Sequence, residues 1–428
     1  MVGVGWLVVM DDWLTRGGPL GGILGFALGA VLLLPIAYVY GQLVPRMPDA
    51  AGEVAYTAAV FPRSVSFATG WMMLLAYFIV CPWEAVAVGR VAAYIFPSLD
   101  SIELYRIAGY PVFLPHLVLG LALTLLLTIL NYRGIALSAA FQNWTAFGVL
   151  ALFVVFAGSG FARGSVRNFE PLFSQRGGFI SVLLVMQIVP YFMTGFEAVS
   201  KSSEEARADF RGGDFIKAMI MSIFVAAAFY IVVIAAVAFA APWQPLLKER
   251  FLTAVALERA IGSHWIVRVI LAAALLSLVK CFNGNFVAAS RILFALGRRW
   301  LIDGRLAWVH PARQTPAAAV ICVGIVTAIC MLLGQAILVP ISEVGSVASA
   351  LGWAATCAAF FAMRPSSKAR TLAVIGLVVC FIFTAMKVVP IVPGHFDRYE
   401  WLALAVWCVI GVSMHLARRG KVGVEQNP

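Results

Sequence analysis

The sequence predicts an all-α integral membrane protein with about twelve transmembrane helices. Its 428 residues are 62% apolar and only 12% charged, which is far from the composition of soluble domains. Many uncharged stretches reach about twenty residues, the length that a helix needs to cross a hydrocarbon core of about 30 Å. These properties exclude a secreted disulfide scaffold, a disordered chain and a soluble enzyme.

Twelve apolar segments lie between breaks rich in charge, proline or glycine. They cover residues 1–10 with a continuation to 14, 21–43, 65–96, 113–130, 138–157, 179–199, 215–241, 265–297, 317–333, 336–363, 371–389 and 401–416. Every segment after the first is long enough to span a bilayer. Ten helical residues extend only about 15 Å, so the first segment is expected to be the second half of a helix that is truncated at its N-terminus.

Glycines on the second segment predict one close helix contact. Gly21, Gly25 and Gly29 recur every four residues and therefore share one face of a helix. A stripe of small residues lets another helix approach closely in a membrane. This pattern indicates packing and does not identify a substrate.

Positive charge is spread unevenly over the predicted loops. The chain holds 31 Lys and Arg against 20 Asp and Glu, a net charge of +11. These basic residues lie in short loops instead of on one face, so nucleic acid is not an expected partner. Most of the Lys and Arg residues follow even-numbered segments or lie in the C-terminal tail. If the first segment runs outward and the segments alternate in direction, these regions all lie on the same, inner side of the membrane. The positive-inside rule then predicts a multi-pass protein of the cytoplasmic membrane with a cytoplasmic C-terminus.

Two segments contain breaks that a lipid-facing helix does not tolerate. Segment 1 begins with Gly3, Val4 and Gly5. Segment 6 runs through Pro190, Tyr191, Phe192, Met193, Thr194, Gly195, Phe196 and Glu197. Corresponding breaks five segments apart are typical of inverted-repeat transporters, which bind a small solute between them. The pattern predicts inverted five-helix repeats at 1–158 and 179–363, followed by a remaining part at 364–428, unless the glycines only allow packing.

Four charged residues lie inside segments or near segment ends, namely Glu84, Arg90, Glu197 and Lys280. A charge at such a position costs several kcal/mol unless it is paired or hydrated, so it indicates a function. Lys280 precedes Arg291 by eleven residues, about 16 Å of helix, which places it near the bilayer centre. A buried lysine can lose its proton near neutral pH. We therefore expect Lys280 to carry protons, or to form a structural ion pair with Glu84 or Glu197.

Three further acids lie near the predicted outer surface. Asp11 and Asp12 follow the break in segment 1 and either line a vestibule that attracts amines or form the solvated end of a helix. Glu343 begins segment 10 as an interfacial residue or as a gate. Together with Glu84, the two aspartates slightly favour cationic or amine substrates.

Other classes of membrane protein find little support in the sequence. It contains no HExxH, no GxSxG elbow and no Walker loop, and its five histidines are scattered near segment ends. A channel would usually carry a repeated filter or a ring of like charges, and neither pattern occurs. We expect no metal and no organic cofactor.

Five local motifs occur in the order found in one transporter family. They are GVGWL at 3–7, YGQL at 40–43 with PRMPDAAGE at 45–53, NYRG at 131–134, GFEA at 195–198 with EE at 204–205, and AASRILFAL at 288–296. Over nearly its whole length the chain resembles the APC superfamily of amino acid, polyamine and organocation transporters. The resemblance implies a LeuT-like fold of two inverted five-helix repeats with two peripheral helices.

The resemblance also implies which groups bind the substrate. Backbone at Gly3, Val4 and Gly5 would receive its carboxylate, in agreement with the partial positive charge at a helix N-terminus. The amine would be bound by backbone around the second break, at Tyr191, Phe192, Met193, Thr194 and Gly195. Either Phe192 or Phe196 is expected to form an aromatic lid.

Coupling and gating are expected to involve Lys280, Glu197, Glu84 and Phe196. Glu197 matches the family's acid after the break in segment 6. Some members carry a lysine in segment 5, whereas residues 147–149 here contain none, and Lys280 is expected to supply that charge from segment 8. The implied transporter is independent of sodium and driven by a proton gradient or by exchange.

The expected function is secondary active transport of amino acids or related small amines by alternating access, without covalent chemistry. The alternatives are a transporter-like sensor that binds solute without net transport and a membrane-embedded enzyme. Expected partners are a small-molecule substrate and membrane lipid, and the oligomeric state is left open. Family members have an arm and a half-helix before the first break, so we expect a start codon assigned too late, or else a truncated product.

Overall fold

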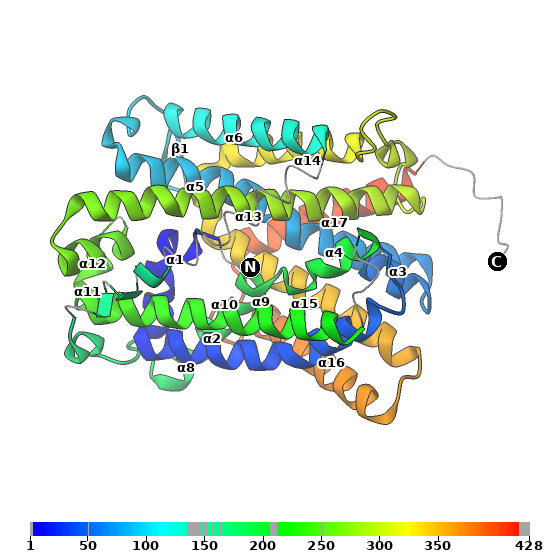
Figure 1. Ribbon diagram of the computed structural model, residues 1–428, viewed down its shortest axis with the longest axis horizontal. Coiled ribbons are helices and arrows are strands. Elements are labelled where there is room, and N and C mark those ends of the chain that lie inside the picture. The colour runs from blue at the N-terminus through cyan, green and yellow to red at the C-terminus, as the bar shows by residue number, and fades with distance from the viewer. Residues whose placement is uncertain are drawn as a thin grey trace.

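A computed structural model describes residues 3–49, 51–134, 164–205, 212–249 and 251–418, with a few positions between 148 and 161. The described chain is helical apart from one small hairpin, and its long helices run side by side along the long axis (Figure 1). Among the described residues, eight helical stretches are long and apolar enough to cross a membrane, and a pair bent by 44°, Gly178–Met186 with Val189–Lys201, would make a ninth.

The first part of the bundle contains the hairpin and ends with the helix after it. Its elements are α1 (Gly5–Val8), α2 (Met10–Leu43), α3 (Glu53–Ala58), α4 (Arg63–Phe78), α5 (Val80–Ile95), η1 (Pro97–Leu99), β1 (Glu103–Ile107), β2 (Tyr110–Phe113) and α6 (Leu114–Arg133). The strands pair antiparallel, with Ile107 opposite Tyr110. Hydrogen bonds from Arg106 lower the pKa of the Glu103 carboxyl in this hairpin. The predicted segment at 138–157 lies almost wholly outside the described residues.

The second part contains the other broken helix. Its elements are η2 (Val166–Phe169), α8 (Gly178–Met186), α9 (Val189–Met193), η3 (Phe196–Glu205), α10 (Gly212–Ala240), α11 (Trp243–Leu246), α12 (Leu252–Ile261), α13 (His264–Arg298) and η4 (Gly304–Ala307). It continues through α14 (Ala317–Cys330), η5 (Met331–Ile337), α15 (Leu338–Ala362), α16 (Ser367–Val388) and α17 (Arg398–Leu416).

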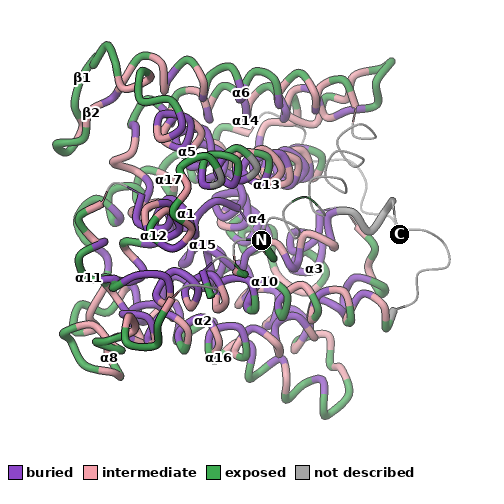
Figure 2. The backbone as a smooth tube through the Cα atoms, turned by 60° about the vertical axis from the view of Figure 1, so that its left-hand side comes forward, coloured by how far each residue is buried: buried purple, intermediate pink, exposed green. Residues whose placement is uncertain are grey.

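The two ends of the bundle differ. The hairpin, α11 and α12 lie at one end, called the hairpin end, and α3 lies at the other, called the α3 end (Figure 1). Burial is greatest among the central helices, whereas α6 and the connections at both ends are largely exposed (Figure 2). Such an outer surface of apolar helices suits a lipid environment.

The first segment was predicted to cover residues 1–10 with a continuation to 14, and its helix extends further than that. It passes Asp11 and Asp12 and continues to Gly17, and the backbone turns at Gly18, where φ is 63°. An ion pair explains the extension, because Arg16 donates to Asp12 one turn earlier at 2.7 Å and stabilises that turn. Glycine tolerates the positive φ, and the proline that follows it suits the start of the next helix.

The glycine stripe packs as the sequence predicts. A Cβ atom added at Gly25 would lie 2.7 Å from Val185, and one added at Gly29 would lie 2.7 Å from Val189. The second segment therefore touches α8 at Gly25 and α9 at Gly29, with no room for a side chain on the glycine face.

Candidate functional site

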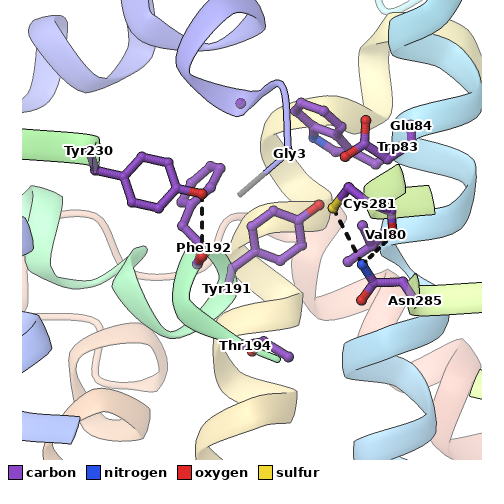
Figure 3. A pocket seen from close by; sticks show the side chains of 11 residues that line it. Gly3, Val80, Trp83, Glu84, Tyr191, Phe192, Thr194, Tyr230, Cys281 and Asn285 are labelled. Atoms are coloured by element: carbon purple, nitrogen blue, oxygen red, sulfur yellow. Dashed lines mark hydrogen bonds between the residues drawn. The ribbon is translucent and has the colours of Figure 1, made fainter. Parts of the chain in front are cut away.

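The two predicted breaks meet at one pocket. Its cavity volume is about 30 Å³, about the share of one water molecule in the liquid, so the surrounding side chains close tightly around it. Eleven residues from α1, α5, α9, α10, α13 and the break after α9 line it (Figure 3): Gly3, Gly5, Val80, Trp83, Glu84, Tyr191, Phe192, Thr194, Tyr230, Cys281 and Asn285. Val4, Met193 and Gly195, also predicted to bind substrate, are not among the residues that line it.

The first break brings bare backbone into the pocket. A Cβ atom added at Gly3 would lie 2.5 Å from Oε1 of Glu84, and one added at Gly5 would lie 2.6 Å from the ring of Phe192. Only glycine fits both positions. The first turn of a helix also leaves amide groups without intrahelical partners and carries partial positive charge. The break therefore presents hydrogen-bond donors suited to an anionic group.

Two serines of α15 hold the second break. Ser349 and Thr194 share a hydrogen bond of 2.6 Å between their hydroxyl oxygens, and the Thr194 hydroxyl also donates to the carbonyl of Pro190 at 2.6 Å. The amide of Tyr191 donates to the hydroxyl of Ser346 at 3.3 Å. The last carbonyls of α9 lack helical partners, so this break presents acceptors suited to an amine.

One wall of the pocket is aromatic. Phe192 packs edge-on against Trp13 with ring centroids 4.9 Å apart, and the hydroxyl of Tyr230 donates to the carbonyl of Phe192 at 3.4 Å. Phe196 does not line the pocket and packs against Trp353 with centroids 5.3 Å apart. Of the two residues expected to form a lid, only Phe192 borders the pocket.

The opposite wall carries an acid. The side chain of Glu84 is 2% exposed, and its Oε2 has no hydrogen-bond partner among the described residues. Asn285 lies beside it on α13 and donates to the carbonyl of Cys281 at 2.8 Å. Glu84, Cys281 and Asn285 thus lie across the pocket from Phe192 and Tyr230 (Figure 3).

Lys280 lies just outside this pocket. It precedes the pocket residue Cys281 and is only partly buried. No ion pair joins it to Glu84 or Glu197 in the part of the chain that the structure describes. The alternative expectation of a structural pair with either acid therefore finds no support. Arg90, the other charge inside the third segment, lies over the ring of Phe251 at 5.3 Å.

A buried network occupies the α3 end. Glu197 accepts hydrogen bonds from the hydroxyl of Tyr77 at 2.9 Å and from the amide of Gly195 at 3.0 Å. Lys201, one turn further along η3, forms an ion pair of 2.5 Å with Glu53 of α3. We call these five residues the α3-end network. It ties the broken helix to α4 and α3.

Other buried groups extend the α3-end network. The hydroxyl of Tyr40 donates to Glu53 at 2.8 Å, and Arg291 donates to the carbonyl of Lys201 at 2.8 Å. Tyr56 lies in α3, which is not one of the helices that could span a membrane. Burial and the nearby Glu53 carboxylate raise the pKa of its hydroxyl. The Tyr56 hydroxyl therefore stays neutral in this network.

A second network occupies the hairpin end. Arg16 pairs with Asp12 and, at 2.7 Å, with Glu343 of α15. Lys387 of α16 pairs with the other oxygen of Glu343 and donates to Gln187 at 3.0 Å. We call these five residues the hairpin-end network. Glu343 is thus buried among cations instead of lying at an interface, and Asp12 binds Arg16.

Several side chains around the two breaks were not predicted from the sequence. Among the pocket residues these are Trp83, Tyr230, Cys281 and Asn285, although an asparagine one turn after a cysteine in an apolar helix is a usable signal. The pairing of Lys201 with Glu53 and of Lys387 with Glu343 was not predicted either. Those partners are far apart in sequence, and no local pattern connects them.

Comparison with known proteins agrees with this geometry. A family model described as amino acid permease matches residues 1–414. A branched-chain amino acid permease (BcaP) of Bacillus subtilis is 25% identical, covering 81% of this chain and 73% of its own.

Two longer matches cover nearly the whole chain. The methylthioribose transporter of Bacillus subtilis is 23% identical over 97% of this chain and 89% of its own. An aromatic amino acid transport protein (AroP) of Escherichia coli is 23% identical, and the match covers 96% of this chain and 90% of its own. These relatives are transporters, not enzymes. The chain is therefore a multi-pass membrane protein that belongs to the amino acid permease family of the APC superfamily.

Proposed function

We propose that this protein is a secondary active transporter that moves an amino acid or a related small amine across the cytoplasmic membrane by alternating access. The observation that carries the proposal is the pocket formed where two interrupted helices meet. Relatives named for branched-chain amino acids, aromatic amino acids and methylthioribose support a small polar solute as the cargo.

The proposed architecture has twelve spans. Two inverted repeats occupy residues 1–158 and 179–363, and the peripheral helices and cytoplasmic tail occupy 364–428. The first helix of each proposed repeat is the interrupted one, and the two interruptions share one pocket, which supports this division. The backbone leaves helical geometry at Gly18 and at Gly334, within two of the long helical stretches.

In the proposed binding mode, amides at Gly3, Val4 and Gly5 bind the carboxylate. Carbonyls between Tyr191 and Gly195 bind the amine. Phe192 closes the aromatic side of the pocket, while Phe196 moves with the broken helix as part of the gate on the α3 side. Amides and carbonyls on opposite breaks suit a zwitterion, because its two charged groups are only a few bonds apart.

Coupling is assigned to Glu197 and Lys280, with transport driven by protons or by exchange and independent of sodium. The position of Glu197 supports this role, because its carboxylate is buried beside the break and accepts a hydrogen bond from the amide of Gly195. The position of Lys280 supports this role because it lies next to the pocket and forms no ion pair with an acid among the described residues. Glu84 was also expected to couple protons, and it lies in the pocket wall itself.

The hairpin-end network and the α3-end network are the proposed gates. One contains Arg16 on the continuation of the first broken helix, and the other contains Lys201 on the continuation of the second. Alternating access requires the two ends to open in turn, so one network would break while the other holds.

Uptake by purified protein in liposomes tests the proposal. Labelled amino acids should accumulate when the interior is alkaline, and replacing sodium by choline should leave the rate unchanged. Lys280→Met should abolish the response to the pH gradient, whereas Lys248→Met, a change in an exposed loop, should not. Binding without accumulation or exchange would indicate a sensor instead, and a requirement for sodium would contradict the proposed coupling.

A further inference from the structure

We propose that Glu84 makes the pocket selective for solutes with a second cationic group, namely compact amino acids whose side chain ends in an ammonium group. This inference rests on the proposed function and adds the substrate class. It begins from one carboxylate, which lies in the wall of the pocket and is 2% exposed.

The carboxylate of Glu84 is incompletely bonded. Its Oε1 lies against the backbone of Gly3 and the sulfur of Cys281, where a Cβ on Gly3 would be 2.5 Å from the oxygen. Its Oε2 has no hydrogen-bond partner among the described residues. A buried charged group without a partner is costly, so such groups are normally paired. The pocket beside Glu84 is the open position for that partner.

The described side chains do not supply a counter-ion. No lysine or arginine there forms an ion pair with Glu84. Arg16, Lys387 and Lys201 are instead bonded to acids of the hairpin-end and α3-end networks. A cation carried by the solute would therefore complete the site.

The position of Glu84 indicates a second cationic group and not the α-amine. The proposed acceptors for the α-amine are carbonyls of the α9 break, on the side of Phe192. Glu84 lies on the other side with Cys281 and Asn285 (Figure 3). A solute with a single ammonium group would leave one of these two acceptor sites empty.

The reach of the side chain must be short. Glu84 is in contact with Gly3, which belongs to the break proposed to bind the carboxylate. The cation and the carboxylate would thus bind at neighbouring positions. Side chains with two or three methylene groups before the ammonium group fit this arrangement, which selects 2,4-diaminobutyrate and ornithine as probes.

The test compares isosteric pairs. Norvaline and norleucine match 2,4-diaminobutyrate and ornithine in shape, with a methyl group in place of the ammonium group. Dissociation constants measured by thermal shift of the purified protein should favour the cationic member by at least about 30-fold. Glu84→Gln should bring that ratio close to one while the neutral members still bind. Glu103→Gln, which removes an acid from the exposed hairpin, should leave the ratio unchanged.

Each result separates the inference from the proposed function. Wild-type protein that binds both members of a pair equally would overturn the inference and leave amino acid transport standing. A preference that persists in Glu84→Gln would overturn the role of Glu84. If that variant does not fold, Glu84→Asp should shift the preference toward ornithine, because it withdraws the carboxylate by one methylene group, and an unchanged ratio would overturn the inference. If neither neutral nor cationic amino acids bind or accumulate, the proposed function itself fails.

Discussion

Glu343→Gln is expected to destabilise the protein more than Lys387→Met does. Glu343 is 5% exposed and lies between Arg16 and Lys387, which is 0% exposed. Removing the negative charge leaves the Lys387 ammonium with only neutral acceptors, at Gln187 and at the carbonyl of Gly394, 3.0 and 3.1 Å away. Removing the ammonium instead leaves Glu343 still paired with Arg16. Removing Glu343 from this ion pair should therefore cost more stability than removing Lys387.

The magnitudes follow from these contacts. An uncompensated buried charge costs about 3–5 kcal/mol in the free energy of unfolding, which is the expectation for Glu343→Gln. Lost hydrogen bonds of a charged group cost about 1–3 kcal/mol, which is the expectation for Lys387→Met. In the double variant no cation is left unpaired, because Arg16 keeps Asp12. The double variant should thus lose less stability than the sum of the single variants, by about 0.5–3 kcal/mol.

Equilibrium unfolding in mixed detergent micelles measures this cycle, with the four proteins compared at one pH and one lipid content. Arg106→Met serves as the control, because its partner Glu103 lies on the exposed hairpin, and it should change stability little. Effects of the two single changes that add to within about 0.5 kcal/mol would refute the reasoning, since they would show that the pair is not coupled.

Two further predictions concern the breaks. Gly5→Ala should weaken solute binding at least tenfold, because the new Cβ would lie 2.6 Å from the ring of Phe192. Gly213→Ala serves as the control and should not weaken binding, because there is open space around Gly213. Equal binding constants for Gly5→Ala and the wild-type protein would contradict the packing argument. Tyr77→Phe should lower the free energy of unfolding by about 1.5–3 kcal/mol, since it removes a buried hydrogen bond to Glu197. Chemical unfolding would show this, and unchanged stability would mean that the bond contributes nothing.

Much of the helical layout is predictable from the sequence because apolar length alone decides it. The stretches at 215–241 and 371–389 agree with α10 and α16 to within a few residues. The break residues were also predictable, since proline and paired glycines interrupt helices for local steric reasons. Gly3, Gly5, Tyr191, Phe192 and Thr194 accordingly line one pocket.

Pairing between distant side chains was not predictable. Asp11 and Asp12 were expected to line a vestibule or to form the solvated end of a helix, yet Arg16 one turn later pairs with Asp12 and the helix continues. The partners of Lys387 and Lys201 depend on which helices are neighbours in space. Sequence periodicity gives the buried face of a helix and not the identity of the helix opposite it.

The glycine contacts of the second segment with α8 and α9 have a mechanical consequence. Val185 of α8 lies against Gly25 and Val189 of α9 lies against Gly29, so the contacts hold the chain on both sides of the 44° bend. The close packing leaves neither helix space to slide along the glycine face without separating from it. The bend is therefore clamped from behind, and a change in its angle must lift at least one of its arms off the second segment.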